Sequence, residues 1–559
     1  MTKTMIKTNT QPKTKTKPMP KTAAFALTAA ALLVTTHALA QTAPDAGQLL
    51  QQNRDQPTAP RGPAINLPLQ GEALTEAAEG GAEVTLQTLT LEGNRVFSDA
   101  QLYQVLGEVL GQRYDLAGLR ELANQLSRYY RDQGYPFARA LLPAQELSAG
   151  HLTIRVVEGR YDRAYTSGPA PLADDLQPWL TPLAPDTPIA SAPLSRQLLL
   201  MSDLPGVKVD PVMRPGSRPG TGELDVQVQP SARVTGMVGA DNQGNRYSGE
   251  YRGRAGVAVN RLLTVGDELD LSALYTSEET WLGSLGYARP LGTQGLRGEL
   301  GYARNDYTLG HGFQGYTGSA DVYTARLRYP VIRRQQHNLA LFGGVRYKHL
   351  KDDIEAFDYR KTTDSRALPV GLTFDARDDL GGGGITWGSA VLTAGTLEID
   401  QRLTDIESDR GFTTLAFDVA RLQALGTGID LYGRVTGQWA DHDDLDGSES
   451  FYLGGPNGVR AYPVGEGSDA RGGLAQLELR YRAAQGVSPF VFYDTGYTPN
   501  GGVDDGESRR IAGAGVGVRY TDAGLSLALA SAWQTQGGDA QSDSDQHDPR
   551  VWGSLTYRW

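Results

Sequence analysis

The 559-residue chain contains no cysteine, which excludes disulfide frameworks, thiolate nucleophiles and metal sites built on cysteine. Beyond residue 40 it also lacks any run of about twenty apolar residues, the length that a membrane-spanning helix needs. Basic residues are not in excess, since the chain contains 64 acidic residues and 53 lysines and arginines. A nucleic-acid partner would require a basic stripe, so this class of partner is not expected.

Motifs for catalysis and nucleotide binding are missing as well. The sequence contains no G-x-S-x-G, H-E-x-x-H or G-x-x-x-x-G-K-[ST] motif. The glycine-rich run at 513–520 lies in an alternating segment, where its glycines would make one face of a strand small. The Asp-rich segments 441–450 and 542–547 lack EF-hand spacing and are interpreted as solvated loops rather than calcium sites. We therefore expect no enzyme, nucleotide, cofactor or metal site.

The first forty residues differ from the rest of the chain. They contain a lysine-rich start without any acid, the short apolar core TAAFALTAAALLVTT, and the tripeptide ALA before Gln41. These features predict a secretory signal peptide, residues 1–40, that is cleaved after Ala40. Its removal takes away six lysines and changes the formal net charge from −11 to −17. An exported chain without a spanning helix is expected to be either soluble or an outer-membrane barrel.

A short helix is predicted over residues 44–56, with Leu49 and Leu50 on one side. The segment that follows, up to residue 81, is rich in Pro, Gly and Ala and is typical of a flexible linker. The helix could be a frayed terminus, or it could be a plug held on this linker. We interpret residues 41–81 as a plug helix and its linker.

The next part of the chain predicts two tandem copies of a small α+β module. In residues 82–160 the order is strand, helix, helix, strand, strand. The first helix begins with a capping box, Ser98 and Gln101, and its apolar spacing extends to Leu110. The same order recurs more weakly in residues 161–230. Each module has a strand edge that could accept an extended peptide by β-augmentation, and the alternative is a plain spacer.

From residue 231 to Trp559 helical periodicity gives way to polar/apolar alternation in segments of about ten residues. A soluble sandwich would show the same alternation. Two features favour a membrane barrel instead: aromatic residues near the strand ends, and connections that alternate between short turns and long loops. The segments number about sixteen, so the predicted fold is α+β modules followed by an antiparallel barrel of about sixteen strands.

One connection, residues 441–470, is long enough to need an explanation. A barrel of sixteen strands keeps an aqueous lumen, which an inward-folded loop would help to fill. Arg460 on this loop would then lose water and need a carboxylate. On a later strand, Asp494 shares one face with Phe492 and Gly496. We expect Arg460 to pair with Asp494, and the alternative is a solvated loop arginine.

Several of these strings resemble the outer-membrane transporters of two-partner secretion, a family related to the BamA-type assembly proteins. LEGNRVFSDAQL, GYPFARALLPAQELSAGHLTIRVVEGRYD and LPGVKVDPVMRPGSRPGTGELDVQV resemble its paired POTRA modules. GGPNGVRAYP is similar to its inward-folded sixth loop, whose usual core is V-R-G-[YF]. Arg460 and Tyr462 match that core, whereas Ala461 stands where the family usually has Gly.

A second motif of the family, F-x-D-x-G, is matched by Phe492, Asp494 and Gly496. The resemblance covers essentially the whole mature chain. It implies a Gram-negative outer-membrane protein with its POTRA modules in the periplasm. These modules would bind the secretion domain of a large, unfolded exoprotein, which the barrel would pass outward without nucleotide hydrolysis.

The other partners implied are outer-membrane lipid and, during biogenesis, the barrel assembly machinery. Three competing functions remain. A BamA-type assembly factor is the closest alternative, but such proteins typically carry more POTRA modules and lack a plug helix. A passive porin would need no periplasmic modules, and a surface enzyme would need a catalytic constellation that the sequence does not contain.

Overall fold

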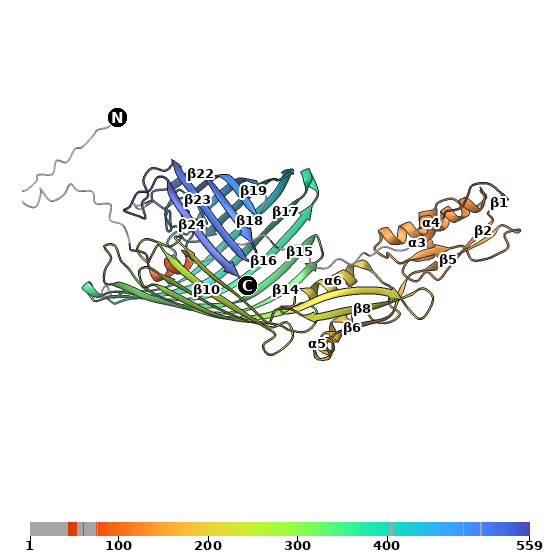
Figure 1. The fold of residues 1–559 in the computed structure, drawn as a ribbon, viewed down its shortest axis with the longest axis horizontal. Coiled ribbons are helices and arrows are strands. Elements are labelled where there is room, and N and C mark those ends of the chain that lie inside the picture. The colour runs from red at the N-terminus through yellow and green to blue at the C-terminus, as the bar shows by residue number, and fades with distance from the viewer. Residues whose placement is uncertain are drawn as a thin grey trace, which may run out of the picture. The chain divides into compact units, whose positions relative to one another are not determined.

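The structure, a computed structural model, describes residues 43–52, 60, 74, 76–402, 406–483, 486–502 and 506–559. The expected signal peptide and most of the expected linker lie outside these residues. Among the residues described, no helix is both long and apolar enough to cross a membrane. The described elements comprise one short helix, α2 (Ala46–Gln52), two α+β modules and a closed barrel (Figure 1).

The first module packs two helices on a three-stranded sheet of order β2-β5-β4. Its capping box is formed, because the Ser98 side chain accepts from the Gln101 N–H and the Gln101 side chain accepts from the Ser98 N–H. The first helix ends at Leu106 because Gly107 adopts φ +74°, so our expectation that it extends to Leu110 was wrong. The elements are β1 (Val84–Thr85), β2 (Thr88–Glu92), α3 (Asp99–Leu106), β3 (Arg113–Tyr114), α4 (Leu116–Asp132), β4 (Arg139–Leu141) and β5 (His151–Val157).

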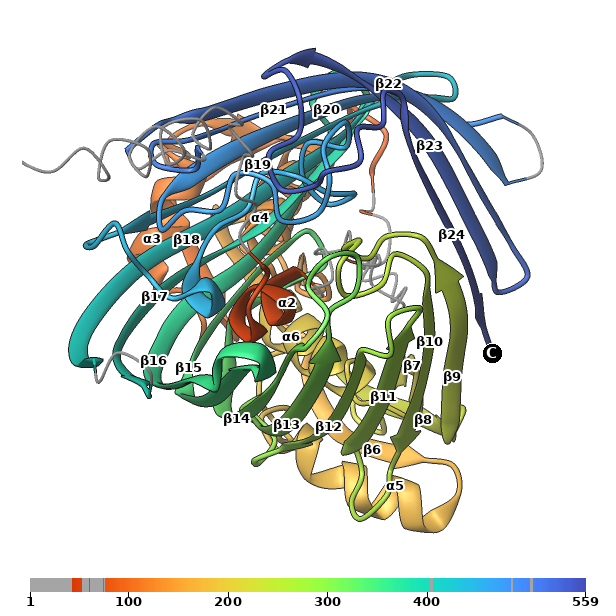
Figure 2. The same cartoon turned by 90° about the vertical axis from the view of Figure 1, so that its left-hand side faces the viewer.

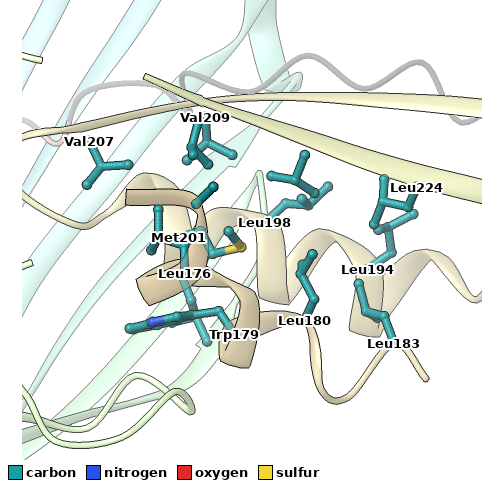
Figure 3. Close-up of a cluster of buried hydrophobic side chains, with 14 of the residues drawn as sticks. Leu176, Trp179, Leu180, Leu183, Leu194, Leu198, Met201, Val207, Val209 and Leu224 are labelled. Carbon is teal, nitrogen blue, oxygen red and sulfur yellow. The ribbon is translucent and has the colours of Figure 1, made fainter. Parts of the chain in front are cut away.

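The second module repeats this plan, with the sheet order β6-β8-β7. Leucines of its two α-helices and of the short 3₁₀ helix meet valines of the sheet in a closed apolar core (Figure 3). Trp179 and Met201 fill the end of this core that Figure 3 shows below Val207 and Val209. The elements are β6 (Arg160–Ser167), α5 (Ala170–Leu176), η1 (Gln177–Leu180), α6 (Ser191–Ser202), β7 (Val207–Pro215) and β8 (Thr221–Pro230).

The barrel is antiparallel throughout, and its sixteen strands close when the last strand pairs with the first. The strands are β9 (Val234–Asp241), β10 (Arg252–Asn260), β11 (Glu268–Thr276), β12 (Trp281–Pro290), β13 (Arg297–Thr308), β14 (Tyr316–Arg333), β15 (His337–Ile354), β16 (Tyr359–Asp378), β17 (Gly384–Gln401), β18 (Ile406–Gly426), β19 (Ile429–Ala440), β20 (Gly472–Tyr481), β21 (Val487–Thr498), β22 (Arg509–Asp522), β23 (Leu525–Gln536) and β24 (Arg550–Arg558). The predicted fold class is confirmed.

The period-2 alternation of the sequence separates an apolar outer face from a polar inner face. On β21, Val491 and Tyr493 are half exposed on the outside, whereas Phe492 and Asp494 are buried inside. The terminal Trp559 completes the closure, because it exchanges backbone hydrogen bonds with Gly236 of β9. This is the arrangement of a transmembrane barrel, in which apolar side chains face lipid and polar side chains face a lumen.

Among the residues that the structure describes, two segments lie inside the barrel. One is α2, which Figure 2 shows surrounded by the strands and which contacts β13, β14 and β15. The other is the connection between β19 and β20, residues 441–471, which we call the inner loop. It includes a 3₁₀ turn, η4 (Gly447–Glu449), that packs directly against α2.

Candidate functional site: the inner loop and the plug helix

The tip of the inner loop is fastened to the barrel wall by Arg460. This residue is 5% exposed, and its Nε and Nη2 donate to the two carboxylate oxygens of Asp494, both at 2.8 Å. The Arg460 backbone N–H donates to the same carboxylate at 3.2 Å. This bidentate geometry is the strongest that an arginine and a carboxylate can form. The structure therefore brings together the two residues that the sequence suggested as a pair.

A second carboxylate, Glu478 on β20, was missed in the sequence. It accepts from Arg460 Nη1 at 2.6 Å and also from Arg519 and Arg480. Burial opposes the charge on Arg460, but its bonds to Asp494 and Glu478 raise its pKa above the ordinary value. The sequence did indicate that Glu478 faces the lumen, because the alternation of residues 472–481 places it on the inner face. What the sequence did not show is that neighbouring strands bring it beside Asp494.

Aromatic rings of the barrel wall pack against the guanidinium of Arg460. The Arg460 guanidinium stacks 3.6 Å from the centroid of the Phe492 ring and also faces Phe490. Across the sheet, Gly515 and Gly517 leave no room for a Cβ, because Phe492 and Phe490 occupy that space. The glycine run at 513–520 thus admits two rings to the inner face of the wall.

The remaining predicted residues of the loop tip are also buried in this region. Tyr462 is fully buried and its hydroxyl donates to the carbonyls of Gln536 and Gly538. At Gly496 a Cβ would press on the Leu453 side chain, so glycine lets the loop lie against the wall. The methyl group of Ala461 packs against Gly513, where a Cβ would collide with it. The wall therefore has space for the alanine that replaces the usual glycine.

The base of the inner loop is held by the opposite side of the barrel. Glu449 of η4 pairs with Arg346 and with Lys348, each at 2.8 Å, and both bases lie on β15. Lys348 is 1% exposed, and its ammonium also donates to the Ser448 carbonyl. The loop thus spans the lumen, with one ionic anchor at its tip and another at its base.

Helix α2, which was predicted to be a plug, is docked on this base. Asp45 caps the helix by accepting the Gln48 N–H at 2.8 Å, and it shares Lys361 of β16 with Asp446 of the inner loop. Gln51 donates to the Ser448 carbonyl. A Cβ on Gly47 would overlap the backbone of Ser448, so the two backbones touch.

The apolar face of α2 is asymmetric. Leu49 is fully buried among Tyr307 and Leu350 of the wall and Tyr247 of the connection between β9 and β10, whereas Leu50 is only half-buried. On the side of the second α+β module, a lumen cavity of about 1300 Å³ extends from Asp203 to Gln51 and Glu449. The helix and the base of the inner loop therefore limit this cavity together.

Deletion of residues 44–56 should raise the single-channel conductance in planar bilayers, because it removes the helix that limits the lumen cavity. Secretion should remain largely intact, since the contacts at the loop tip do not involve α2. Replacement of the same residues by a Gly/Ser linker of equal length is the matched control for chain connectivity and should give the same rise. An unchanged conductance in both variants would show that α2 does not obstruct the pore.

Asp45 gives this docking a pH dependence. Burial raises the pKa of its carboxyl to about 6, and the nearby carboxylates of Asp446 and Asp352 add to the rise. Lys361 and the Gln48 N–H act in the opposite direction. The docked helix therefore holds a proton on Asp45 more tightly than an undocked helix, whose carboxyl has the ordinary pKa of 3.8.

We expect docking of α2 to be strongest below about pH 4 and to weaken as the pH rises through 6, because the docked form has the higher pKa. A shift of about two units corresponds to about 3 kcal/mol at most. Asp45→Asn keeps the N-cap and should dock the helix more firmly at neutral pH, with a lower open probability that changes less between pH 5 and 7.5 than that of the wild type. Asp443→Asn, on an exposed part of the loop, should behave like the wild type. Wild-type open probability that is equal at both pH values would contradict this assignment.

No cluster of residues able to hold a metal ion occurs in the described part of the chain. The site consists of buried ion pairs, stacked rings and backbone contacts between a helix, a loop and a wall. Such an arrangement can hold a pore closed and release it.

Comparisons with known proteins agree with this architecture. Residues 220–520 match the model of the family described as haemolysin secretion/activation protein ShlB/FhaC/HecB, and residues 84–159 match the ShlB-type POTRA domain. The heme/hemopexin transporter protein HuxB of Haemophilus influenzae is 27% identical over 527 residues, which cover 88% of this chain and 91% of HuxB. The outer membrane transporter CdiB of Dickeya dadantii is 23% identical over 88% of this chain and 90% of its own.

The fold also matches the solved structure of CdiB from Escherichia coli. The TM-score is 0.71 at 21% identity, over 88% of this chain and 94% of that one. Together, the barrel, the POTRA module and these relatives define an outer-membrane transporter of the two-partner secretion type, with its POTRA modules in the periplasm. The chain belongs to the haemolysin secretion/activation protein family ShlB/FhaC/HecB.

Proposed function

We propose that this transporter recognises one large, unfolded exoprotein in the periplasm and passes it through the barrel to the cell surface without nucleotide hydrolysis. The observation that carries the proposal is the pair of internal obstructions, α2 and the inner loop, anchored across a wet lumen by ion pairs. A passive pore needs no such closure. A pore that opens only in the presence of its exoprotein needs a closure that can be released.

The periplasmic modules supply the surface for recognition. Strand β2 lies at one edge of the first module's sheet and contains no proline, so it can accept an extended chain by β-augmentation. The second module is tied to the barrel, where Arg196 donates to the Pro330 carbonyl at 2.9 Å and Asp203 pairs with Arg333 at 2.6 Å. A chain bound at the modules would thus be delivered beside the mouth of the lumen cavity, which Asp203, Pro330 and Arg333 also line.

A BamA-type assembly factor is the second candidate function. Two observations favour the transporter: the described residues contain two α+β modules rather than a longer series, and α2 occupies the lumen. An assembly factor would insert other barrels into the membrane, and a helix inside its lumen has no evident part in that reaction.

The test is co-expression with an exoprotein that carries an N-terminal secretion domain and is encoded beside this chain. We expect the exoprotein to reach the medium or the cell surface only when the transporter is present, and to remain in the periplasm otherwise. Release of the exoprotein at equal levels without the transporter would refute the proposal. A general loss of other outer-membrane barrels on depletion would favour the assembly factor.

A further inference from the structure

A small cavity of about 220 Å³ lies at the end of the barrel opposite the POTRA connection, beside the closing strands β9 and β24. Its walls come from three connections: residues 242–251, residues 542–549 and the return of the inner loop at Pro463 and Val464. The ion pairs that hold Arg460 and α2 do not involve the charged residues of this cavity. Its most unusual lining residue is Arg550, the first residue of β24.

The Arg550 guanidinium is buried without full compensation. The residue is 6% exposed, yet its Nε and Nη2 have no hydrogen-bond partner within the described residues. Its approach to Asp543 spans 3.6 Å, beyond hydrogen-bond reach, and Asp543 is also engaged by Arg246 and by the Asp545 N–H. Because buried donors are almost always paired, a group inside the cavity is expected to accept from Arg550.

The geometry of these two donors selects the ligand. Nε–H and Nη2–H lie on one edge of the guanidinium, which matches two oxygens of a single oxyanion. The carboxylates of Glu250 and Asp543 line the same cavity, so an anion without a proton would meet repulsion there. A phosphate that keeps one P–OH can accept from Arg550 and donate to a carboxylate. Sulfate, which has no proton at neutral pH, cannot do both.

We propose that this cavity is a binding site for a hydrogen-bearing phosphate group, held by the Nε/Nη2 edge of Arg550 and by the carboxylates of Glu250 and Asp543. The phosphate belongs either to a free ion or to the headgroup of an outer-leaflet glycolipid. The second source is within reach because Tyr251 and Val551, which line the cavity, are 67% and 54% exposed, and Val551 alternates along β24 with the buried Arg550 and Trp552.

Occupancy of this site would act on the inner loop. The next inward residue on β24, Trp552, donates its indole N–H to the Arg460 carbonyl at 2.8 Å. The Arg550 guanidinium lies 5.9 Å from the centroid of the Trp552 ring. Across the cavity, Asn245 donates to the Val464 carbonyl at 3.1 Å. A bound phosphate would therefore join β24 to the two connections, residues 242–251 and 542–549, that border the loop tip, and it should raise the thermal stability of the assembled barrel.

The test is calorimetric titration of the full, detergent-purified protein with sodium phosphate and, separately, with sodium sulfate. We expect saturable phosphate binding and an affinity for sulfate at least tenfold weaker. Arg550→Met should abolish phosphate binding, and Arg550→Lys should weaken it tenfold or more because the two-donor edge is lost. Glu250→Gln should reduce the preference for phosphate over sulfate. Arg360→Met, which removes an exposed arginine paired with Asp353, is the matched control and should bind as the wild type does.

Nanodiscs distinguish the two sources of phosphate. If the headgroup is the natural ligand, discs with a phosphorylated glycolipid should suppress phosphate binding, and discs with the dephosphorylated lipid should restore it. Equal binding in both discs would assign the site to the free ion. Wild-type protein without saturable phosphate binding in detergent and without any difference between the discs would overturn the proposal. Equal phosphate binding by the wild type and Arg550→Met would also overturn it. If Arg550→Met fails to assemble, the test is the wild type alone, and equal affinities for phosphate and sulfate would overturn the proposal.

Discussion

Arg460→Ala is expected to reduce secretion of the exoprotein by tenfold or more while the barrel still assembles. The substitution removes the shared partner of two buried carboxylates, Asp494 and Glu478, which are 0% and 3% exposed. Breaking a buried pair on one side costs about 3–5 kcal/mol, because the other charge is left without compensation. Every ~1.4 kcal/mol is a factor of ten in the equilibrium between the anchored and the released loop. Secreted exoprotein is measured in the medium, with assembly checked by heat-modifiable migration on gels.

Two further variants serve as comparisons for the loss of secretion in Arg460→Ala. Arg460→Lys keeps the charge but not the bidentate fork and should recover only part of the secretion. Arg471→Ala is the matched control on the same loop, since its ion pair with Asp443 is exposed and should contribute little. In a double-mutant cycle, Arg460→Ala combined with Asp494→Ala should be no worse than Arg460→Ala alone. Strictly additive losses would mean that the two residues act independently, and the anchoring role of Arg460 would be wrong.

Deletion of residues 82–160 should abolish binding of the exoprotein's secretion domain to the transporter. The segment forms its own closed apolar core, with residues such as Leu102, Leu126 and Ile154 fully buried, so its removal leaves no exposed remnant of that core. The second module remains fixed to the barrel through Arg196 and Asp203. Binding is measured by co-purification of the unfolded secretion domain with the full-length and the shortened chain.

The control for this deletion is assembly of the barrel, which should be unchanged because none of its sixteen strands is touched. The variant without residues 44–56 provides a second comparison and should bind the secretion domain normally. Full binding by the chain that lacks residues 82–160 would place recognition elsewhere and would remove the role proposed for the first module.

The fold could be predicted from the sequence because its elements follow from local periodicity. Outward and inward residues alternate along the barrel strands, as on β21, and this pattern depends only on the pleat of a strand. The end of α3 was predicted too far along the chain, since Val109 and Leu110 continue the apolar spacing after the helix has stopped. Gly107 takes a left-handed conformation there, and spacing alone does not reveal that choice.

The site was only partly predictable for a different reason. Arg460 and Asp494 could be selected because each was unusual in its own segment. Glu478 joins them through the register of β20 and β21, in which it lies opposite Phe492. Likewise, Lys348 pairs with the inner loop and Lys361 pairs with Asp45 before α2. These partners are far apart in the sequence, so local periodicity could not predict the contacts. Contacts between the wall and the segments inside it require the closed barrel to be known.

The transporter is expected to move an unfolded exoprotein across a membrane without any other protein or any nucleotide. This expectation is tested most directly with proteoliposomes that contain only the purified transporter, with the POTRA modules facing outward, and an exoprotein diluted from denaturant without any nucleotide. We predict that the exoprotein becomes protected from external protease inside wild-type vesicles, and that Arg460→Ala vesicles protect at least tenfold less. Absence of protection in wild-type vesicles, or protection that appears only when ATP is added, would contradict the account.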